Sequence, residues 1–253
     1  MKIDYAILSA MPEELEFLIN KFSNLKYTII KINELTFKIY DYKNTNVLIS
    51  HTGIGTGFAA SVLTFIHAHF NPEYFLVAGT AGGIGNNLKL RDVIIAESAF
   101  EAEMLEIASV IKGTPFENCL IHPLNNKRPP NHYPGNAELL SIFDSLNFGG
   151  LTIHKGTIVS SNAFPAPKEL FEKIKCLNPY CIDMETSAFY QTAWLLNLKI
   201  LCVRGISNIL NSDGSDDMLH ESDLKGSSLA AATVLHAILD ASIALKNHMA
   251  VKH

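Results

Sequence analysis

Side chains that could transfer protons or bind a ligand follow several apolar, strand-like runs of this sequence. In chain order they are Ala10-Met11-Pro12-Glu13-Glu14, Thr52-Gly53-Ile54-Gly55, Gly79-Thr80-Ala81-Gly82-Gly83, Ser161-Asn162-Ala163-Phe164-Pro165, Met184-Glu185 and Ser207-Asn208. Ligands of open α/β sheets bind at the carboxyl ends of the strands. We therefore expect one site that combines carboxylates, glycine turns, an aromatic ring and an amide, and its carboxylates could act as general acids or bases.

A glycine-rich segment at residues 75–92, FLVAGTAGGIGNNLKLRD, narrows the choice of ligand. Its apolar run ends in four glycines, and glycine after a strand lets the backbone approach a ligand closely. A dinucleotide fold needs GxGxxG after the first strand, and a P-loop needs GxxxxGK followed by Ser or Thr. Neither pattern occurs here, so this segment is not expected to bind a dinucleotide or to act as a P-loop.

The elements that must position these residues alternate along the chain. Strand-like runs are Ile3–Ser9, Tyr27–Ile32, Thr36–Tyr42, Val47–Ser50, Tyr74–Ala78, Val93–Ala96, Leu151–Ser160, Cys181–Asp183 and Ile200–Ile206. Helix-like runs are Pro12–Lys21, Gly57–Phe70, Asn136–Ser145, Pro167–Lys175, Thr186–Leu196 and Leu224–Lys246. The early strands suggest antiparallel hairpins and the later ones alternate with helices, which predicts one mixed-sheet α/β domain over residues 1–253. Residues 112–135 are predicted to form a long surface loop, either a lid or an insertion.

Composition excludes several classes of function. The net charge of −5 gives no electrostatic reason to expect nucleic acid or an anionic membrane as a partner. The four cysteines form no CxxC pair and have no histidine at zinc-ligand spacing, so no metal site is expected. No signal peptide is expected, and no apolar run is expected to approach the roughly 20 residues of a membrane span. We therefore expect a cytoplasmic protein with reduced cysteines.

Six motifs, each at the end of a strand-like run, indicate a family. AMPEE, TGIG, AGTAGG, SSNAF, DMET and VRGISN occur in this order. Together they resemble the nucleoside phosphorylase/nucleosidase superfamily, especially its 5′-methylthioadenosine/S-adenosylhomocysteine nucleosidase branch, from residue 3 to about residue 245. The resemblance implies a three-layer α/β/α fold with a central mixed, twisted sheet. It also implies a purine nucleoside as the substrate, a homodimer, and no metal or organic cofactor.

The resemblance also implies roles for individual residues. Glu14 matches the glutamate that positions or deprotonates the attacking water, and Glu185 matches a carboxylate that accepts bonds from the sugar hydroxyls. Asn208 stands where the family has an aspartate that protonates the leaving purine. The substrate-binding positions are Met11 and Ile54 at the 5′ substituent, Thr80, Ala81 and Gly82 beside the sugar and water, Phe164 and Pro165 at the purine, and Met184 at the ribose.

These roles agree with the chemistry of the bond. Cleavage of a ribosyl–purine bond passes through a cationic sugar, as in glycoside hydrolysis. One carboxylate favours that charge, a second activates water, and a flat aromatic ring stacks on the base. Phosphorylases of the superfamily carry an arginine for phosphate where this chain has Val77. Without that guanidinium, water is favoured over phosphate as the attacking group.

Three departures from the family pattern concern the base and the 5′ group. Asn208 cannot give up a proton as a carboxylic acid can, although it can read either adenine or a 6-oxopurine. Pro165 has no backbone N–H to donate to the purine. The segment Glu101-Ala-Glu-Met104 lacks the branch's His-Asp pattern. Glu13 keeps a structural interpretation, as an acidic residue in the first turn of a helix.

The sequence therefore predicts an N-ribosyl hydrolase that acts on 5′-modified purine nucleosides, with methylthioadenosine and S-adenosylhomocysteine as leading substrates. One alternative is a 6-oxopurine nucleoside hydrolase of the futalosine type, or a phosphorylase, because of Pro165 and Asn208. The other is a nucleoside-binding protein without catalytic activity, because the aspartate is missing. Retention of Glu14, Met184 and Glu185 argues against that last alternative.

Overall fold

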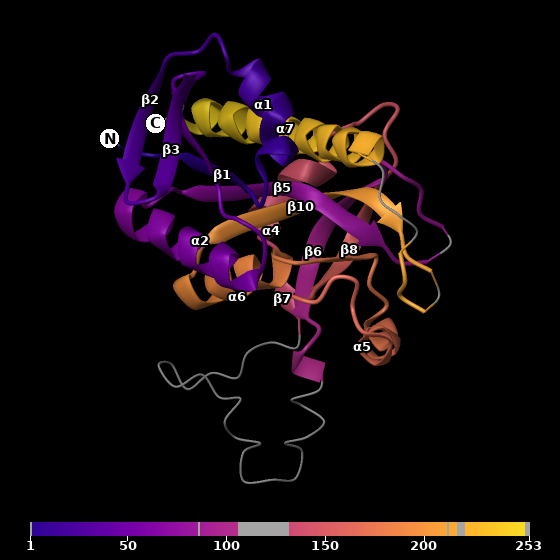
Figure 1. Ribbon diagram of the computed structural model, residues 1–253. Coiled ribbons are helices and arrows are strands. Elements are labelled where there is room, and N and C mark those ends of the chain that lie inside the picture. Colours follow the sequence, from indigo (N-terminus) through magenta and orange to yellow (C-terminus); the bar gives the residue numbers. More distant parts are fainter. Residues whose placement is uncertain (1, 86, 106–131, 212, 217–220, 251–253) are drawn as a thin grey trace.

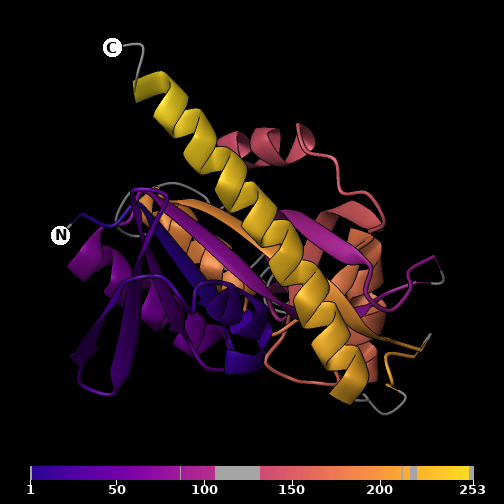
Figure 2. The same ribbon diagram turned by 90° about the horizontal axis from the view of Figure 1, so that it is seen from above.

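A mixed β-sheet forms the middle layer of the molecule, and helices cover both of its faces (Figures 1 and 2). The computed structural model describes residues 2–85, 87–105, 132–211, 213–216 and 221–250. The predicted three-layer α/β/α fold with a central mixed sheet is confirmed. Of the predicted surface loop at residues 112–135, positions 112–131 lie outside the described residues.

The sheet brings strands from both halves of the chain together. Its strands are β1 (Tyr5–Ser9), β2 (Tyr27–Ile32), β3 (Leu35–Tyr42), β4 (Thr45–His51), β5 (Tyr74–Gly83), β6 (Val93–Glu101), β7 (Tyr133–Pro134), β8 (Ile153–Ser160), β9 (Cys181–Asp183) and β10 (Lys199–Ile209). Their order is β10-β6-β8-β9-β5-β1-β4-β3-β2, and β7 pairs with β6. A further pairing of β10 with β5 closes β5, β9, β8, β6 and β10 into a ring, so the ends of β5, β9 and β10 meet.

Two apolar clusters hold the helices against the sheet. The helices are η1 (Pro12–Leu15), α1 (Glu16–Lys21), α2 (Thr56–Phe70), α4 (Ala137–Asp144), α5 (Lys168–Ile174), η3 (Lys175–Leu177), α6 (Thr186–Leu196) and α7 (Glu221–Ala250). The buried sides of α2 and α6 pack on one face, where Leu63 and Phe189 join the same cluster. The buried sides of α1, α4 and α7 pack on the other face, with Leu18, Phe143 and Leu235 in the second cluster.

The structure corrects two predicted boundaries. Gly79–Gly83, predicted to form a loop, continues β5 because β10 pairs with it on one side and β9 on the other. Strand pairing therefore binds much of the backbone of this segment, while the N–H of Thr80 donates to the side chain of Glu14. The predicted helix Pro12–Lys21 is divided into a 3₁₀ turn, Pro12–Leu15, and an α-helix that begins at Glu16.

The long C-terminal helix α7 also differs from expectation. Its segment Asp223–His248 is apolar and long enough, by length and composition alone, to cross a membrane. Within this fold, however, 61% of its most apolar window is buried. It lies across the sheet as the largest helix of its layer (Figure 2). The apolar composition is therefore explained by packing in the core.

Candidate active site

Glu14 is a buried carboxylate that is held from two sides. It lies on η1 and is 3% exposed. Its Oε2 accepts hydrogen bonds from the backbone N–H groups of Ala10 and Met11, both at 3.0 Å. Its Oε1 accepts bonds from the backbone N–H of Thr80 at 2.8 Å and from Thr80 Oγ1 at 3.2 Å. Burial raises the pKa of Glu14, while Arg204 and these bonds oppose the rise.

Glu185 is a second buried carboxylate, immediately before α6. It is 5% exposed, and its Oε1 accepts a hydrogen bond from the backbone N–H of Gly55 at 2.9 Å. Its Oε2 lies 3.5 Å from Arg204 Nη2. Burial raises the pKa of Glu185 to about 7, with Arg204 opposing this and the negative charges of Asp183 and Glu14 adding to it. Glu14 and Glu185 therefore share one electrostatic environment.

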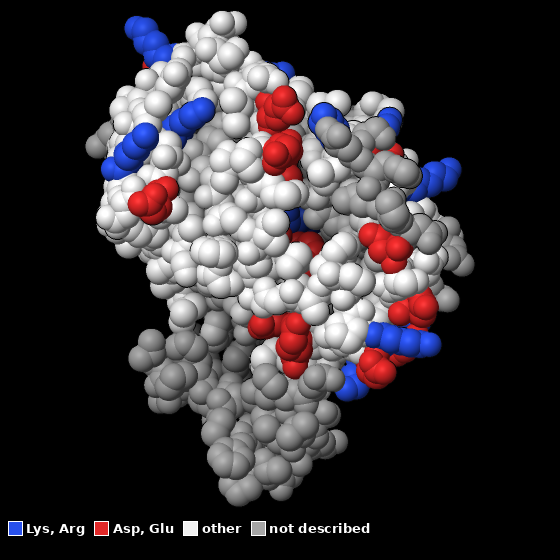
Figure 3. All heavy atoms as spheres, viewed as in Figure 1, with Lys and Arg blue, Asp and Glu red and all other residues white. Residues whose placement is uncertain are grey.

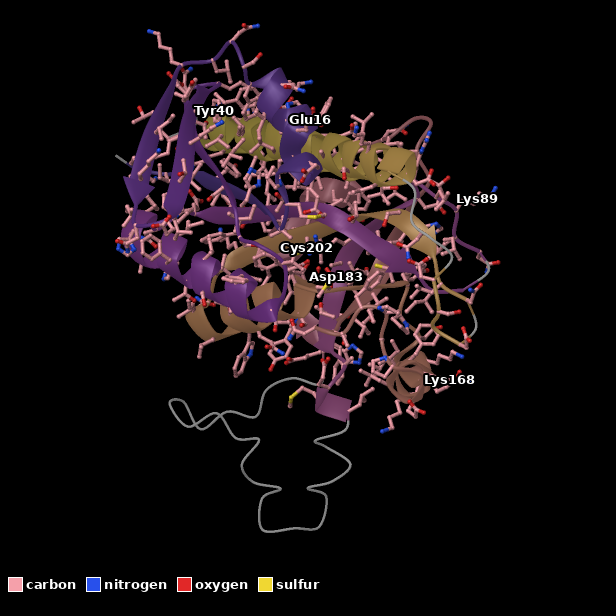
Figure 4. The ribbon with its side chains drawn as sticks, in the orientation of Figure 1. Glu16, Tyr40, Lys89, Lys168, Asp183 and Cys202 are labelled. Atoms are coloured by element: carbon pink, nitrogen blue, oxygen red, sulfur yellow. The ribbon has the colours of Figure 1, made fainter. Side chains whose placement is uncertain are left out.

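Arg204 joins these carboxylates from the centre of β10. Its side chain is fully buried, and its Nε donates to Asp183 Oδ2 at 2.7 Å and to Thr186 Oγ1 at 3.0 Å. Although burial alone would lower it, the pKa of Arg204 is raised because the charges of Asp183, Glu185 and Glu14 surround it. Its Nη1 has no partner among the described residues. Figure 4 labels Asp183 in the interior of the molecule, near Cys202 of β10.

Gly79 makes room for this arrangement. It is paired with Arg204 in the β5–β10 register. A Cβ atom at Gly79 would lie 1.7 Å from Arg204 Nη1 and 2.9 Å from Glu14 Oε1, so any larger residue would displace the guanidinium. Gly79 is therefore explained by the close approach of two side chains, Arg204 and Glu14. From the sequence, the glycines of this segment were expected beside the sugar and a water, and Arg204 was given no role.

Asn162 links two loops at the edge of the site. The backbone N–H of Thr56 donates to Asn162 Oδ1 at 3.0 Å, and Asn162 Nδ2 donates to Thr56 Oγ1 at 2.7 Å. Gly55, one residue earlier, is the donor to Glu185. The N-terminal amides of α2 are thus bound by side chains from the loops after β8 and β9. A helix N-terminus with free amides attracts anions, and here two of those amides are already satisfied.

Exposed apolar side chains lie on the loops of Ile54 and Phe164 and on the first turn of α2, near the carboxylates. Ile54 is 51% exposed, Phe58 64% and Phe164 44%. The two hydrogen bonds between Asn162 and Thr56 hold the loop of Phe164 against the turn of Ile54. Figure 3 shows a hollow in the middle of one face of the molecule, with a positive and a negative side chain visible at its floor. An apolar rim above buried charges suits a flat, partly polar ligand.

The remaining predicted positions lie on the same strand ends. Ala81 and Gly82 belong to β5, where they pair with Ile206 and Asn208 of β10. Asn208 is 6% exposed. Met11, whose backbone N–H donates to Glu14, and Met184, which precedes Glu185, are partly buried, and Pro165 is exposed directly after Phe164. The structure thus connects Glu14 to Thr80 by a hydrogen bond and to Glu185 by charge, and it places Asn208 beside Gly82.

Arg204, Asp183 and Asn162 were missed by the sequence analysis as site residues. A signal for Arg204 was present, because a lone charge within the apolar run Leu201–Ile206 must find a buried partner. The described residues contain no group of three or more His, Cys, Asp and Glu side chains that could hold a metal ion. With three carboxylates around one guanidinium, the cluster has net negative charge when all are ionised, which favours a cationic transition state.

Comparisons with known proteins place this arrangement in a family. Residues 4–244 match the family model described as the phosphorylase superfamily. A 5′-methylthioadenosine/S-adenosylhomocysteine nucleosidase from Maridesulfovibrio salexigens is 25% identical over 248 residues, which are 93% of this chain and 97% of that protein. The Bacillus subtilis protein of the same name is 26% identical over 212 residues, with coverage of 82% and 87%.

Solved structures agree on the fold. Futalosine hydrolase from Helicobacter pylori superposes with a TM-score of 0.77 at 20% identity, covering 94% of this chain and 97% of that one. An aspartate-to-asparagine mutant of the Helicobacter pylori nucleosidase, with 5′-methylthioadenosine in its active site, gives the same TM-score and identity with coverage of 95% and 99%. The chain described here therefore belongs to the phosphorylase superfamily.

Proposed function

We propose that the protein is an N-ribosyl hydrolase that releases the purine from 5′-modified nucleosides, with 5′-methylthioadenosine and S-adenosylhomocysteine as its leading substrates. The observation that carries the proposal is the joint placement of Glu14, Glu185 and Arg204 in one buried cluster. The names of its relatives support the same reaction. In this reaction the bond between C1′ and the purine nitrogen breaks, and the oxygen of a water bonds to C1′.

Each residue near the substrate has a distinct role in the proposed reaction. Glu14 holds the water and accepts its proton, and the longest of its bonds, from Thr80 Oγ1 at 3.2 Å, is the one that a water can most easily replace. Arg204 Nη1 offers a further donor to that water, because it is buried and has no partner among the described residues. Glu185 accepts the sugar hydroxyls and stabilises the positive charge on the sugar. Phe164 stacks on the base from the rim.

The proposal also includes the oligomeric state of the protein. We infer a homodimer, because exposed apolar side chains at the rim, Ile54 and Phe58 among them, suit a contact with a second copy. Light scattering of the purified protein measures its mass directly, and a monomer at micromolar concentration would contradict the inference.

The proposal also includes a cytoplasmic role in methionine salvage, with reduced cysteines and without a cofactor, in line with the resemblance to the nucleosidases. Cys181 and Cys202 are buried free thiols.

Hydrolysis is tested by a panel of nucleosides incubated with the purified protein, with and without phosphate. We expect free base and the free 5-substituted ribose without phosphate, and no acceleration when phosphate is added. The reason is that Val77 replaces the arginine expected of a phosphorylase, and that amides of Gly55 and Thr56 are already bound by Glu185 and Asn162. Phosphate-dependent formation of a ribose 1-phosphate would show a phosphorylase instead. Tight binding without any base release would show a binding protein.

The rate should also fall as the pH decreases through neutrality. Glu185 acts as a carboxylate, and burial raises its pKa to about 7. Because the ionised form is the active one, a raised pKa means that activity is lost as pH falls through that value, by about tenfold for each pH unit below it. We expect kcat/KM, measured from pH 5 to pH 9, to rise to a plateau above neutral pH. A profile that stays flat down to pH 5 would contradict this assignment, provided the protein remains folded there.

Asn162→Ala should weaken substrate binding more than catalysis. The substitution removes two hydrogen bonds that hold the loop of Phe164 against α2, each worth about 0.5–1.5 kcal/mol. We expect KM to rise about tenfold and kcat to change less than about threefold. Thr56→Val, which keeps the bond from the backbone N–H, should show roughly half of this effect on a logarithmic scale. Asn24→Ala, in an exposed turn, is the matched control, and a loss confined to kcat would contradict the proposed positioning role.

A further inference from the structure

A pair of polar side chains lies where β1 and β4 end, close to the turn that carries Glu14. Ser9 and His51 are the last residues of these strands, and they are partners in their parallel register. Ser9 is fully buried and His51 is partly buried. Ser9 Oγ lies 2.7 Å from the carbonyl oxygen of Met11 and 2.8 Å from His51 Nδ1. The Ser9 hydroxyl therefore connects the end of β4 to the loop that precedes Glu14.

The partners of Ser9 determine where the hydrogen atoms of this chain of bonds lie. A carbonyl oxygen only accepts, so the single proton of the Ser9 hydroxyl is donated to Met11. Ser9 Oγ must then accept its bond from His51, and this requires a proton on His51 Nδ1. Burial lowers the pKa of His51, with Lys38 adding to the decrease and Glu13 opposing it. At neutral pH His51 is consequently neutral, in the tautomer that carries its proton on Nδ1.

The carbonyl of Met11 connects the pair to Glu14. Met11 is the residue before η1, and its carbonyl also accepts a bond from the backbone N–H of Glu14, at 3.3 Å. The N–H of Met11 donates to Glu14 Oε2 at 3.0 Å. Because the bond from Ser9 is the shorter of the two at this carbonyl, it fixes the start of η1 more firmly. Ser9 and His51 thus hold the backbone that in turn holds the carboxylate.

The same pair lies where the loops of the two buried carboxylates meet. Beyond the strands, the backbone N–H of Thr52 still donates to the carbonyl of Ser9, at 2.8 Å. This loop continues to Gly55, whose N–H donates to Glu185. A displacement at Ser9 would therefore change the position of Glu14 relative to Glu185, and in the proposed reaction both act on one sugar.

We propose that Ser9 and His51 are positioning residues for the reaction, which act through Met11 to hold Glu14 where it accepts the proton of the attacking water. This inference rests on the proposed hydrolase function and deepens it. Neither side chain takes or gives up a proton, and the proton on His51 Nδ1 stays in place throughout. Loss of the pair should lower kcat, because Glu14 is then misaligned with the water, and should leave nucleoside binding nearly unchanged.

The test removes the donor at position 51 and then restores it. His51→Leu deletes the donor and should reduce kcat by about tenfold, the value of one hydrogen bond, with KM changed by less than about threefold. His51→Asn carries an amide N–H as many bonds from Cα as Nδ1, and should recover kcat to within about threefold of the wild type. His248→Leu, at an exposed histidine of α7, is the control. Thermal unfolding is measured for each variant, and kcat is expressed per folded molecule, so that a loss of stability alone does not change it.

Ser9→Ala tests the middle of the chain of bonds. It removes the hydroxyl that joins His51 to Met11 and should also lower kcat by about tenfold. Because the two residues act in series, the double variant of Ser9→Ala and His51→Leu should lie within about twofold of Ser9→Ala alone. Independent effects would multiply to about a hundredfold and would contradict the proposed chain of bonds.

A measurement on the wild-type protein tests the geometry without any assay of activity. Nitrogen NMR of protein labelled at histidine distinguishes the two neutral tautomers of the ring. The signals of His51 are identified by their absence from His51→Asn. We expect a neutral ring with its proton on Nδ1, and a proton on Nε2 instead would overturn the inference.

The outcomes separate this inference from the function on which it rests. A wild-type protein that releases no base from any nucleoside would overturn the hydrolase itself, whatever the tautomer of His51. In an active protein, a kcat of His51→Leu within about twofold of the wild type would overturn only the inference. A loss confined to KM, or no recovery in His51→Asn, would do the same. If His51→Leu does not fold, the kcat of Ser9→Ala and the tautomer of the wild-type protein decide.

Discussion

Glu14→Gln is expected to lower kcat for base release by about a thousandfold or more while nucleoside binding survives. An amide of nearly the same shape cannot accept the proton of the attacking water. The residue is bound to Met11 and to Thr80 of β5 and interacts with Arg204, so the environment of the water is otherwise retained. The rate is measured by chromatography of the released base, and binding is measured by calorimetry with the intact nucleoside.

The same substitution has a structural effect that must be measured separately. Glu14 accepts four bonds, two at each carboxylate oxygen. The NH₂ group of a glutamine must therefore face at least one backbone N–H, a mismatch of about 1–3 kcal/mol. Thermal unfolding shows whether the variant is still folded at the assay temperature. Glu13→Gln, the exposed neighbour, is the control and should retain full activity and stability.

A folded Glu14→Gln variant with activity within tenfold of wild type would rule out Glu14 as the group that accepts the proton. A variant that loses binding as well would indicate that Glu14 orders the site and would leave the acceptor unassigned. Because Glu185 shares the cluster, Glu185→Gln provides the comparison. It should raise KM as well as lower kcat, since the proposed contacts of Glu185 are with the sugar.

The strand ends that carry the site could be predicted from the sequence. Apolar, β-branched runs such as Tyr74–Ala78 and Ile200–Ile206 mark buried strands, and polar residues that follow them must lie at the edge of the sheet. Glu14 and Glu185 were identified in this way together with the motifs around them. Glu14 and Glu185 lie in one cluster because the strands close into a ring, in which the ends of β5, β9 and β10 meet. The order in which these strands pair cannot be predicted from a local sequence pattern.

The glycines of β5 show why other features of the site could not be predicted from the sequence. Four glycines after an apolar run indicate a loop that contacts a ligand, yet in this fold the first three of them continue the strand. Gly79 is small because Arg204 of the adjacent strand occupies the space of its side chain. Such a requirement is set by the register of two strands more than a hundred residues apart in the sequence. A local propensity cannot express such a requirement. Asn162 is a similar case because Thr56, its partner, begins helix α2, which is distant in the sequence.

Arg204→Met is expected to reduce the free energy of unfolding by about 3–5 kcal/mol and base release by more than about a hundredfold. The substitution leaves Asp183 and Glu185 buried without their counter-charge. Breaking a buried ion pair from one side is strongly destabilising because the remaining charge has no compensation. For a domain of this size the loss corresponds to a decrease in Tm of roughly 10 °C. Arg91→Met, an exposed arginine, is the control.

A second substitution tests whether the effect of Arg204 is electrostatic. If uncompensated charge is the cause, adding Glu185→Gln to Arg204→Met should recover about 1 kcal/mol or more of the lost stability. Equal or lower stability of the double variant would mean that Arg204 contributes through packing and through its bonds to Asp183 and Thr186. Arg204→Lys keeps the charge without the planar fork that reaches both carboxylates. It should therefore be more stable than Arg204→Met, and its kcat should remain well below that of the wild type because the attacking water loses the donor at Nη1.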